Sequence, residues 1–475
     1  MAPNRRTDQK PLGRPDKTDQ DSRPPEGSAR TTTERAVTAR GLAASVLQRV
    51  TDEGAYASRA LDAELSRSQL EPRDAALATE IVYGSLRVLP DLDRTLSARL
   101  TRDPARMDGF VRATLRTAAY QLAHLGRLPT HAIVDESVSQ VRARRGPKLA
   151  GFVNAILRRL AEARPAKPEL ASAMVLPDWV RAALLASLGA ERLGHLLAHG
   201  AQSPALCLRS EGAPRDQVLA DLRAALPGAD IEPTALSPLG ILVRRVGSPR
   251  ALPGYAEGAF SVQEEGAQLI ALALGAQPGE RIADVCAGHG GKTTLLARAV
   301  TSSGSVDALD KDERKLRAIA PELERTGVTA SIELHAVDLS VGTGGLSDTF
   351  DRVLVDAPCS GLGTAHRRPE LLLRLNADDP ARLGLLQRRI LQRAAGLVRP
   401  GGLLAYAVCS PMREEGYEVA QAFAAEHPHF ELVRTAAHPA LPPPDADGVL
   451  QIGPWLTPAG AGPDAYQLIF WRRSP

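Results

Sequence analysis

The sequence predicts a multidomain protein in which an all-α N-terminal domain and a small α+β linker domain precede a C-terminal α/β domain. Apolar residues recur every three to four positions up to about residue 166, and short apolar runs alternate with helical segments from residue 259 onward. The length of 475 residues also exceeds what one hydrophobic core usually serves. We therefore expect domains at 35–166, 167–258 and 259–475, after a tail at 1–34.

The composition limits the class of protein. Residues 1–34 contain almost no apolar side chain, which predicts a disordered tail. The 4 cysteines are too few and too scattered for a disulfide framework, and neither a signal peptide nor a long charge-free apolar run is present. We expect a cytoplasmic monomer with reduced thiols. The net charge of +3 neither demands nor excludes a polyanionic partner, and 4% aromatic residues argue against binding mainly by base stacking.

The N-terminal domain is predicted to be helical because its apolar residues keep helical spacing between glycine and proline breaks. The recurring positions are Leu42, Val46 and Val50, then Leu77, Ile81 and Leu86, then Leu115, Ala119 and Leu122. Residues 138–148 and 151–159 form two amphipathic stretches whose polar sides are rich in arginine. These arginines either contact RNA or only solvate the helices, and the pattern does not decide between the two.

Three prolines, Pro165, Pro168 and Pro177, mark the start of the linker domain, where weak helices mix with strand-like runs such as 240–246. The regular alternation that follows predicts a Rossmann-like, mainly parallel sheet with ligands at the carboxyl ends of its strands. Expected strands are 281–285, 305–309, 332–337, 352–355 and 403–407, and expected helices are 292–300, 312–325 and 381–397.

A glycine-rich turn follows the first of these strands and opens a helix. It comprises Cys286, Ala287, Gly288, His289, Gly290, Gly291 and Lys292. Glycines there let the backbone approach a ligand at the positive end of a helix. A P-loop would need glycine at Cys286, and the dinucleotide fingerprint would need glycine at Thr293, so the turn matches neither motif.

Acidic residues stand at successive strand ends. Asp284 precedes the glycine turn, Asp310 ends the second strand and Asp338 ends the third. A carboxylate at the position of Asp310 is suited to ribose hydroxyls, and Asp338 could flank an adenine. Each acid alone could equally be a helix cap or a turn residue. Together they predict a site for a nucleoside-containing cofactor.

Two cysteines end strands beside this site. Asp356 and Cys359 share one tight turn, and Cys409 follows another strand, whereas Cys207 reads as a small buried apolar residue. Two thiols and an acid suit substitution at carbon 5 of cytosine, which needs a thiolate at carbon 6 and an acid near nitrogen 3. A nearby cation would favour the thiolate, and Lys292 and Arg367 are the candidates. The residues alone do not choose between Cys359 and Cys409 as nucleophile.

At these motifs the chain resembles the RsmB/Sun family of bacterial 16S rRNA cytosine-C5 methyltransferases. The helical segments 80–87, 120–122, 128–132 and 151–158 are similar to the NusB-like RNA-binding domain of that family, and 258–269 is similar to the lead-in to its catalytic core. His289 stands where the family usually has proline.

The resemblance implies the following expectations. The turn from Cys286 to Lys292, with Asp310, Asp338 and Asp356, would bind S-adenosylmethionine. Cys409 would be the nucleophile and Cys359 would assist release of the methylated base, with Asp356 and Lys292 completing the catalytic set and no metal. The substrate would be RNA, most simply 16S rRNA or a pre-ribosomal particle. A non-catalytic RNA-binding assembly factor is the alternative, but it would have no chemical use for two thiols.

Overall fold

The computed structural model describes residues 38–100, 103–163, 174–347, 349–434, 438–457 and 462–475. The predicted tail at 1–34 lies outside these residues. No helix in the described part of the chain is both long enough and apolar enough to cross a membrane.

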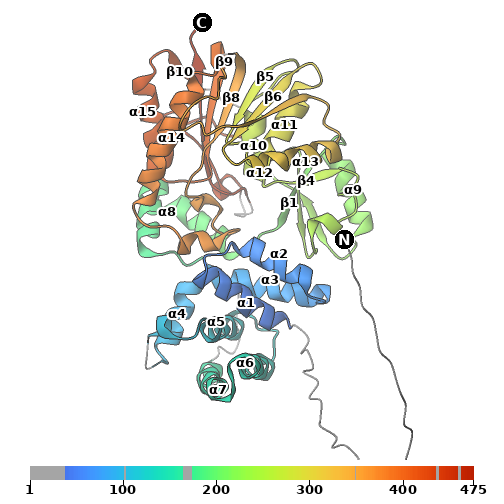
Figure 1. The fold of residues 1–475 in the computed structure, drawn as a ribbon, viewed down its shortest axis with the longest axis vertical. Coiled ribbons are helices and arrows are strands. Elements are labelled where there is room, and N and C mark those ends of the chain that lie inside the picture. Colours follow the sequence, from blue (N-terminus) through green and yellow to red (C-terminus); the bar gives the residue numbers. More distant parts are fainter. Residues whose placement is uncertain (1–37, 101–102, 164–173, 348, 435–437, 458–461) are drawn as a thin grey trace, which may run out of the picture. The chain divides into compact units, whose positions relative to one another are not determined.

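The N-terminal domain is helical, as predicted. Its helices are α1 (Ala39–Asp52), α2 (Ala57–Arg67), α3 (Pro72–Arg87), α4 (Leu89–Ser97), α5 (Gly109–His124), α6 (Thr130–Arg145) and α7 (Pro147–Glu162) (Figure 1). The apolar positions that predicted these helices form their buried faces: α1 buries Leu42, Val46 and Val50, and α5 buries Leu115 and Leu122. Burial of one face is what stabilises an amphipathic helix in a bundle.

A helix and a small sheet follow. Helix α8 (Asp178–Ala201) is interrupted at Gly189, whose φ of 73° lies in the left-handed region. The sheet is antiparallel in the order β2-β3-β1-β4, with strands β1 (Leu206–Ser210), β2 (Asp230–Pro233), β3 (Gly240–Arg244) and β4 (Phe260–Val262), and it packs with helix α9 (Arg215–Ala225). Strand β4 shows that this sheet takes residues from beyond position 258, where we expected the linker domain to end.

The C-terminal domain is built on a second sheet, in the order β10-β12-β9-β8-β5-β6-β7 with β11 paired to β12. Its parallel strands are β5 (Arg281–Val285), β6 (Ser305–Asp310), β7 (Ser331–Ala336), β8 (Phe350–Asp356) and β9 (Val398–Val408). Each contains a predicted strand or overlaps one. The expected α/β fold is therefore confirmed.

Helices cover both faces of this sheet (Figure 1). Helices α14 (Asp379–Ala395) and α15 (Tyr417–Glu426) pack on one face, while α10 (Glu265–Ala273) and α11 (Gly291–Val300) pack on the other. Successive residues of β8 alternate between the two cores, since Val353 and Val355 join the first and Leu354 joins the second. Burial on both faces explains the apolar run at residues 353–355 of β8.

Two features differ from the sequence-based expectation. The helix expected at 312–325 is two helices, α12 (Glu313–Arg317) and α13 (Ile319–Thr326), because Pro321 has no N–H and its ring would clash with the carbonyl four residues earlier. The chain also ends in antiparallel strands, β10 (Phe430–Leu432), β11 (Leu450–Ile452) and β12 (Tyr466–Arg473), which were not predicted.

Candidate active site

The two turns that carry Cys359 and Cys409 meet at one point. Cys359 follows β8 and Cys409 follows β9, and these strands are parallel neighbours whose ends are in register, with Asp356 opposite Ala407. The two Sγ atoms lie 3.2 Å apart. Gly363 lets the first turn pack closely, because a Cβ at this position would lie 1.8 Å from a backbone oxygen of Ala465. The predicted convergence of the two cysteines is therefore present in the structure.

The surroundings shift the pKa values of the two thiols in opposite directions. The hydrogen bond from Cys359 lowers the pKa of the Cys409 thiol against the opposing effect of burial, and the charges of Arg368 and Lys292 add to that lowering. The same contact, together with burial and the charge of Glu415, raises the pKa of Cys359 well above its ordinary value. These two directions favour the thiolate at Cys409 and the thiol, as its hydrogen-bond donor, at Cys359.

Lys292 and Asp356 form an ion pair beside the cysteines. Lys292 Nζ lies 2.7 Å from Asp356 Oδ2, and the lysine side chain is largely buried. Burial disfavours the ammonium ion, but the carboxylates of Asp356 and Asp284 outweigh it and raise the pKa of Lys292. Lys292 is thus a fixed positive charge next to Cys409, as the sequence analysis proposed.

Arg367, the second cation suggested from the sequence, binds partners other than the cysteines. It pairs with buried Asp464 at 3.1 Å and donates to the carbonyl of Ala205 at 2.8 Å. The neighbouring Arg368 is the arginine whose charge acts on Cys409. Spacing in the sequence could not distinguish two adjacent arginines that point to different partners.

The glycine-rich turn links β5 to α11. Gly288 and Gly290 have φ of 60° and 78°, and a Cβ at Gly290 would come within 2.7 Å of Ile319. Asp310 Oδ2 accepts from the backbone N–H of Gly288 at 3.0 Å, so the acid at the end of β6 holds the turn. The side chain of His289 is exposed.

The other predicted cofactor residues differ in their surroundings. Asp284 is fully buried, and burial raises the pKa of its carboxyl to about 7. Thr293 donates to Asp284 Oδ2 at 2.6 Å, whereas Asp284 Oδ1 has no hydrogen-bond partner among the described residues. Burial also raises the pKa of the Cys286 thiol, which excludes it as a resting thiolate. Asp338 is exposed, and its contacts, from Ser340, are those of a local turn. Its adenine contact stays a prediction.

One residue that braces the turn escaped the sequence analysis. Arg209, on β1, is fully buried and donates to the carbonyl of Gly291 at 2.6 Å and to Thr294 Oγ1 at 2.8 Å. It is paired with Glu211. The small sheet therefore contributes directly to the shape of the turn. An arginine inside a short strand gives no sequence signal of such a role.

A second group of polar residues has the composition of a metal site. His199, His366 and Asp464 are buried with their possible metal-ligand atoms within 4.8 Å of one another. His366 Nδ1 and Arg367 Nε each lie 3.1 Å from the Asp464 carboxylate, and the charge of Arg367 holds the pKa of that carboxyl well below its usual range despite burial. An ion-pair network accounts for this cluster without a metal.

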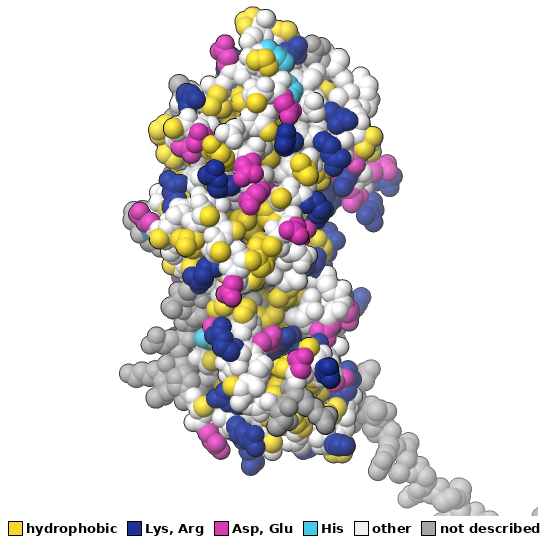
Figure 2. Space-filling view, turned by 90° about the vertical axis from the view of Figure 1, so that its left-hand side faces the viewer, with side chains coloured by type: hydrophobic (Ala, Val, Ile, Leu, Met, Phe, Trp, Pro, Cys, Tyr) yellow, Lys and Arg dark blue, Asp and Glu magenta, His cyan; other side chains and the backbone are white. Residues whose placement is uncertain are grey.

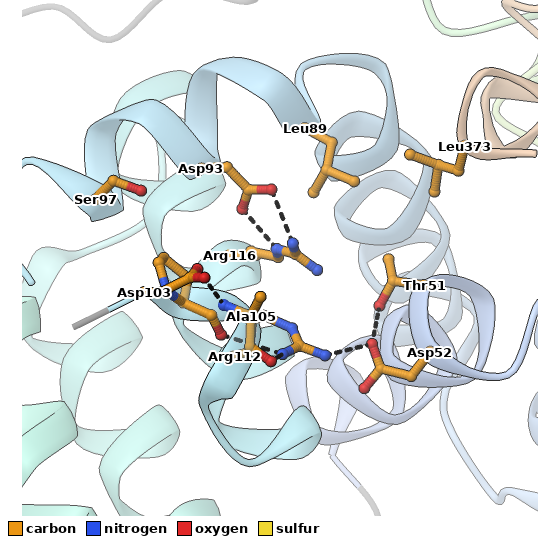
Figure 3. Close-up of a pocket in the computed structure, with 11 residues that line it drawn as sticks. Thr51, Asp52, Leu89, Asp93, Ser97, Asp103, Ala105, Arg112, Arg116 and Leu373 are labelled. Carbon is orange, nitrogen blue, oxygen red and sulfur yellow. Dashed lines mark hydrogen bonds and ion pairs between the residues drawn. The ribbon is translucent and has the colours of Figure 1, made fainter. Parts of the chain in front are cut away.

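A pocket of about 460 Å³ lies in the helical domain (Figure 3). Its arginines are already paired. Arg116 donates to both carboxylate oxygens of Asp93, and Arg112 donates to the carboxylate of Asp52 at 2.6 Å. With its positive charges neutralised, this pocket is a poor site for a phosphate.

Two family models match this chain. The family model described as "16S rRNA methyltransferase RsmB/F" matches residues 271–446, and the NusB family model matches residues 37–162. The ribosomal RNA small subunit methyltransferase B of Thermus thermophilus is 36% identical over 400 residues, which cover 83% of this chain and 89% of that protein. Its counterpart from Vibrio vulnificus is 33% identical over 405 residues, covering 83% and 92%.

The chain belongs to the RsmB family of ribosomal RNA methyltransferases. It is an S-adenosylmethionine-dependent enzyme with a NusB domain at its N-terminus. Among solved structures, the fold matches PH0851 with a TM-score of 0.76 and 22% identity over 92% of this chain and 99% of that one. It also matches NSun6 from Pyrococcus horikoshii with SFG, with a TM-score of 0.53 and 17% identity over 63% and 99%. These two likenesses show the fold.

The site residues of this RsmB-family chain fit S-adenosylmethionine. The turn offers backbone at the N-terminus of α11, and among the described residues Asp310 accepts from two backbone N–H groups, at 3.0 Å from Gly288 and 2.8 Å from Asp312. A carboxylate has about four acceptor positions, so ribose hydroxyls can still be bound. The buried Oδ1 of Asp284 has no hydrogen-bond partner among the described residues, which leaves an acceptor position near the turn.

Proposed function

We propose that the protein methylates carbon 5 of a cytosine in 16S rRNA through a covalent adduct between Cys409 and carbon 6 of the base. The observation that carries this proposal is the thiol pair: two sulfurs 3.2 Å apart with opposite pKa shifts, one favoured as thiolate and the other held as thiol. A methyltransferase acting on an oxygen or an exocyclic nitrogen has no need of such a pair.

The steps assign each residue a task. The Cys409 thiolate adds to carbon 6, and the displaced electron pair is delocalised toward nitrogen 3, where the Lys292–Asp356 pair supplies polar partners. S-adenosylmethionine, when bound, supplies the methyl group as an electrophile for carbon 5. The carbon-5 proton then leaves to water, the bond between carbon 6 and sulfur breaks, and its electron pair returns to Cys409. The S–H of Cys359 stabilises that departing thiolate.

The base has to leave its stack for this chemistry, because a thiolate cannot reach carbon 6 within a helix. RNA must therefore be held beside the catalytic domain, and we propose that the helical domain contributes. Arg142, Lys148, Arg158 and Arg159 are exposed on α6 and α7, whereas Arg145 of the same segment is paired with Asp108 at 2.9 Å. On the face shown in Figure 2, basic and acidic side chains are interspersed, so no single-sign patch on that face marks an alternative RNA path.

Bisulfite sequencing of total RNA from cells with and without the gene tests the proposal. We expect one or a few protected cytosines in 16S rRNA to lose protection without the gene and to regain it when purified enzyme and S-adenosylmethionine are added. Methylation of rRNA at another atom, with no change in bisulfite protection, would contradict cytosine-C5 chemistry. Binding of rRNA without any methyl transfer would instead indicate an assembly factor.

A further inference from the structure

A buried carboxylate lies directly behind the two cysteine turns. Glu415, in the short 3₁₀ helix η5 (Arg413–Glu415), is 0% exposed. Its Oε1 accepts from the backbone N–H of Ser360 at 2.6 Å and from Gln387 Nε2 at 3.2 Å. Its Oε2 lies 2.5 Å from the hydroxyls of both Ser360 and Ser410. One side chain thus contacts both residues that follow the cysteines.

The neighbours of this carboxylate are unusual for a buried acid. Within the described part of the chain, its hydrogen-bond partners are all neutral donors, and no lysine or arginine forms an ion pair with it. Burying a charge without a counter-ion is costly unless hydrogen bonds compensate for lost water. Four donor groups supply part of that compensation: burial raises the pKa of Glu415, and the hydrogen bonds from Ser360, Ser410 and Gln387 oppose that rise. A glutamine or an apolar residue would fill the same volume without the electrostatic cost.

The contacts of Glu415 fix the geometry of the thiol pair. Ser360 follows Cys359 and Ser410 follows Cys409, and their hydroxyls also lie 3.0 Å apart. The backbone carbonyl of Glu415 accepts from the hydroxyl of Tyr406, on the strand that carries Cys409. The 3.2 Å separation of the sulfurs is therefore supported from behind by one carboxylate that contacts both turns.

We propose that Glu415 is a positioning residue for the methyl transfer: it ties the two cysteine turns together, and its negative charge keeps Cys359 protonated so that Cys409 alone becomes the thiolate. The raised pKa of Cys359, to which the charge of Glu415 contributes, agrees with this role. The inference rests on the proposed function, because it explains how two adjacent thiols take up different tasks. It does not place Glu415 in contact with the base.

The test is site-resolved alkylation of the full-length protein without RNA. Iodoacetamide is applied over a range of pH, and peptide mass spectrometry reports the rates at Cys359 and Cys409 separately. In the wild type we expect Cys409 to react at a lower pH than Cys359. Glu415→Gln keeps the size of the side chain and removes its charge, so Cys359 should titrate at lower pH and the rate preference for Cys409 should fall at least tenfold, about one pKa unit.

Two further variants separate charge from position. Glu414→Gln removes the adjacent, half-buried carboxylate and should leave both rates unchanged. Glu415→Asp keeps the charge on a shorter side chain, so Cys359 should stay unreactive while formation of a Cys359–Cys409 disulfide with diamide slows severalfold. The affinity for S-adenosylmethionine shows whether each variant is folded. If Glu415→Gln is not folded, the rate of disulfide formation in Glu415→Asp tests the inference instead.

The outcomes are distinct from those for the proposed function. Unchanged alkylation preference in a folded Glu415→Gln variant, or unchanged disulfide formation in a folded Glu415→Asp variant, would overturn the inference. Neither assay contains RNA. Both therefore measure the reactivity of Cys359 and Cys409 even if the methylated atom is not carbon 5 of cytosine. Loss of bisulfite protection in cells tests the function alone.

Discussion

Replacing Asp310 should weaken cofactor binding more than any other single acid at the strand ends. Its carboxylate is nearly buried, holds the glycine turn through Gly288 and retains acceptor positions for ribose. Asp310→Ala removes charge-assisted hydrogen bonds that contribute about 1.5–3 kcal/mol each. One such bond corresponds to roughly a 10- to 150-fold loss of affinity.

Isothermal titration calorimetry with S-adenosylmethionine measures this loss, and Asp338→Ala is the matched control. Asp338 also follows a parallel strand, but it is exposed and its contacts are those of a local turn. We expect a change below about threefold for the control, since it removes less than about 0.7 kcal/mol of binding. Equal losses in the two variants, or none at Asp310, would refute the assignment of the ribose site to the end of β6.

Three further predictions concern the thiols and the RNA. Lys292→Gln removes a charge that lowers the pKa of Cys409, so the acid limb of the pH–rate profile should move to higher pH. Diamide should cross-link Cys359 to Cys409 and stop methylation until a thiol is added, because the sulfurs already lie 3.2 Å apart. The double variant Arg158→Gln/Arg159→Gln should weaken RNA binding and reduce the slope of log affinity against log salt by about 0.7 per lost phosphate contact.

The RNA prediction has a matched control in the chain. Arg314→Gln/Arg317→Gln removes two exposed arginines from α12 and should leave RNA affinity unchanged if the helical domain supplies the contacts. A pH profile that does not move in the Lys292 variant would show that the hydrogen bond from Cys359 and the charge of Arg368 set the thiolate without Lys292. Persistent activity after complete oxidation would mean that the thiols are not catalytic.

The sequence predicted those parts of the molecule that depend on local patterns. Strands β5, β6 and β8 were predicted because short apolar stretches alternate with helical segments in this part of the chain, and strand-end turns bring distant cysteines together in such a sheet. Strand β12 was missed because its place in the sheet depends on pairing with β9, more than fifty residues earlier, and nothing local reports that pairing.

The residues that support the site were less accessible to sequence reasoning. Glu415 reads as one of two adjacent glutamates, and only the fold shows that it alone is buried against Ser360 and Ser410. Arg209 likewise acquires its role from a contact with the glycine-rich turn, more than eighty residues away. Contacts of this kind leave no motif in the sequence, because they join elements that meet only after the sheets and helices have packed.

The most direct test of covalent catalysis compares two cysteine variants on denaturing gels with 16S rRNA and S-adenosylmethionine. Cys409→Ala should give no protein–RNA adduct and no methylation, because the proposed nucleophile is gone while burial and the charge of Glu415 still raise the pKa of Cys359. Cys359→Ala should accumulate a denaturant-resistant adduct with methylated RNA, because Lys292 still favours the attacking thiolate while the departing sulfur has lost its donor. An adduct in the Cys409 variant alone would reverse the two roles, and methylation by both variants without any adduct would contradict the covalent mechanism.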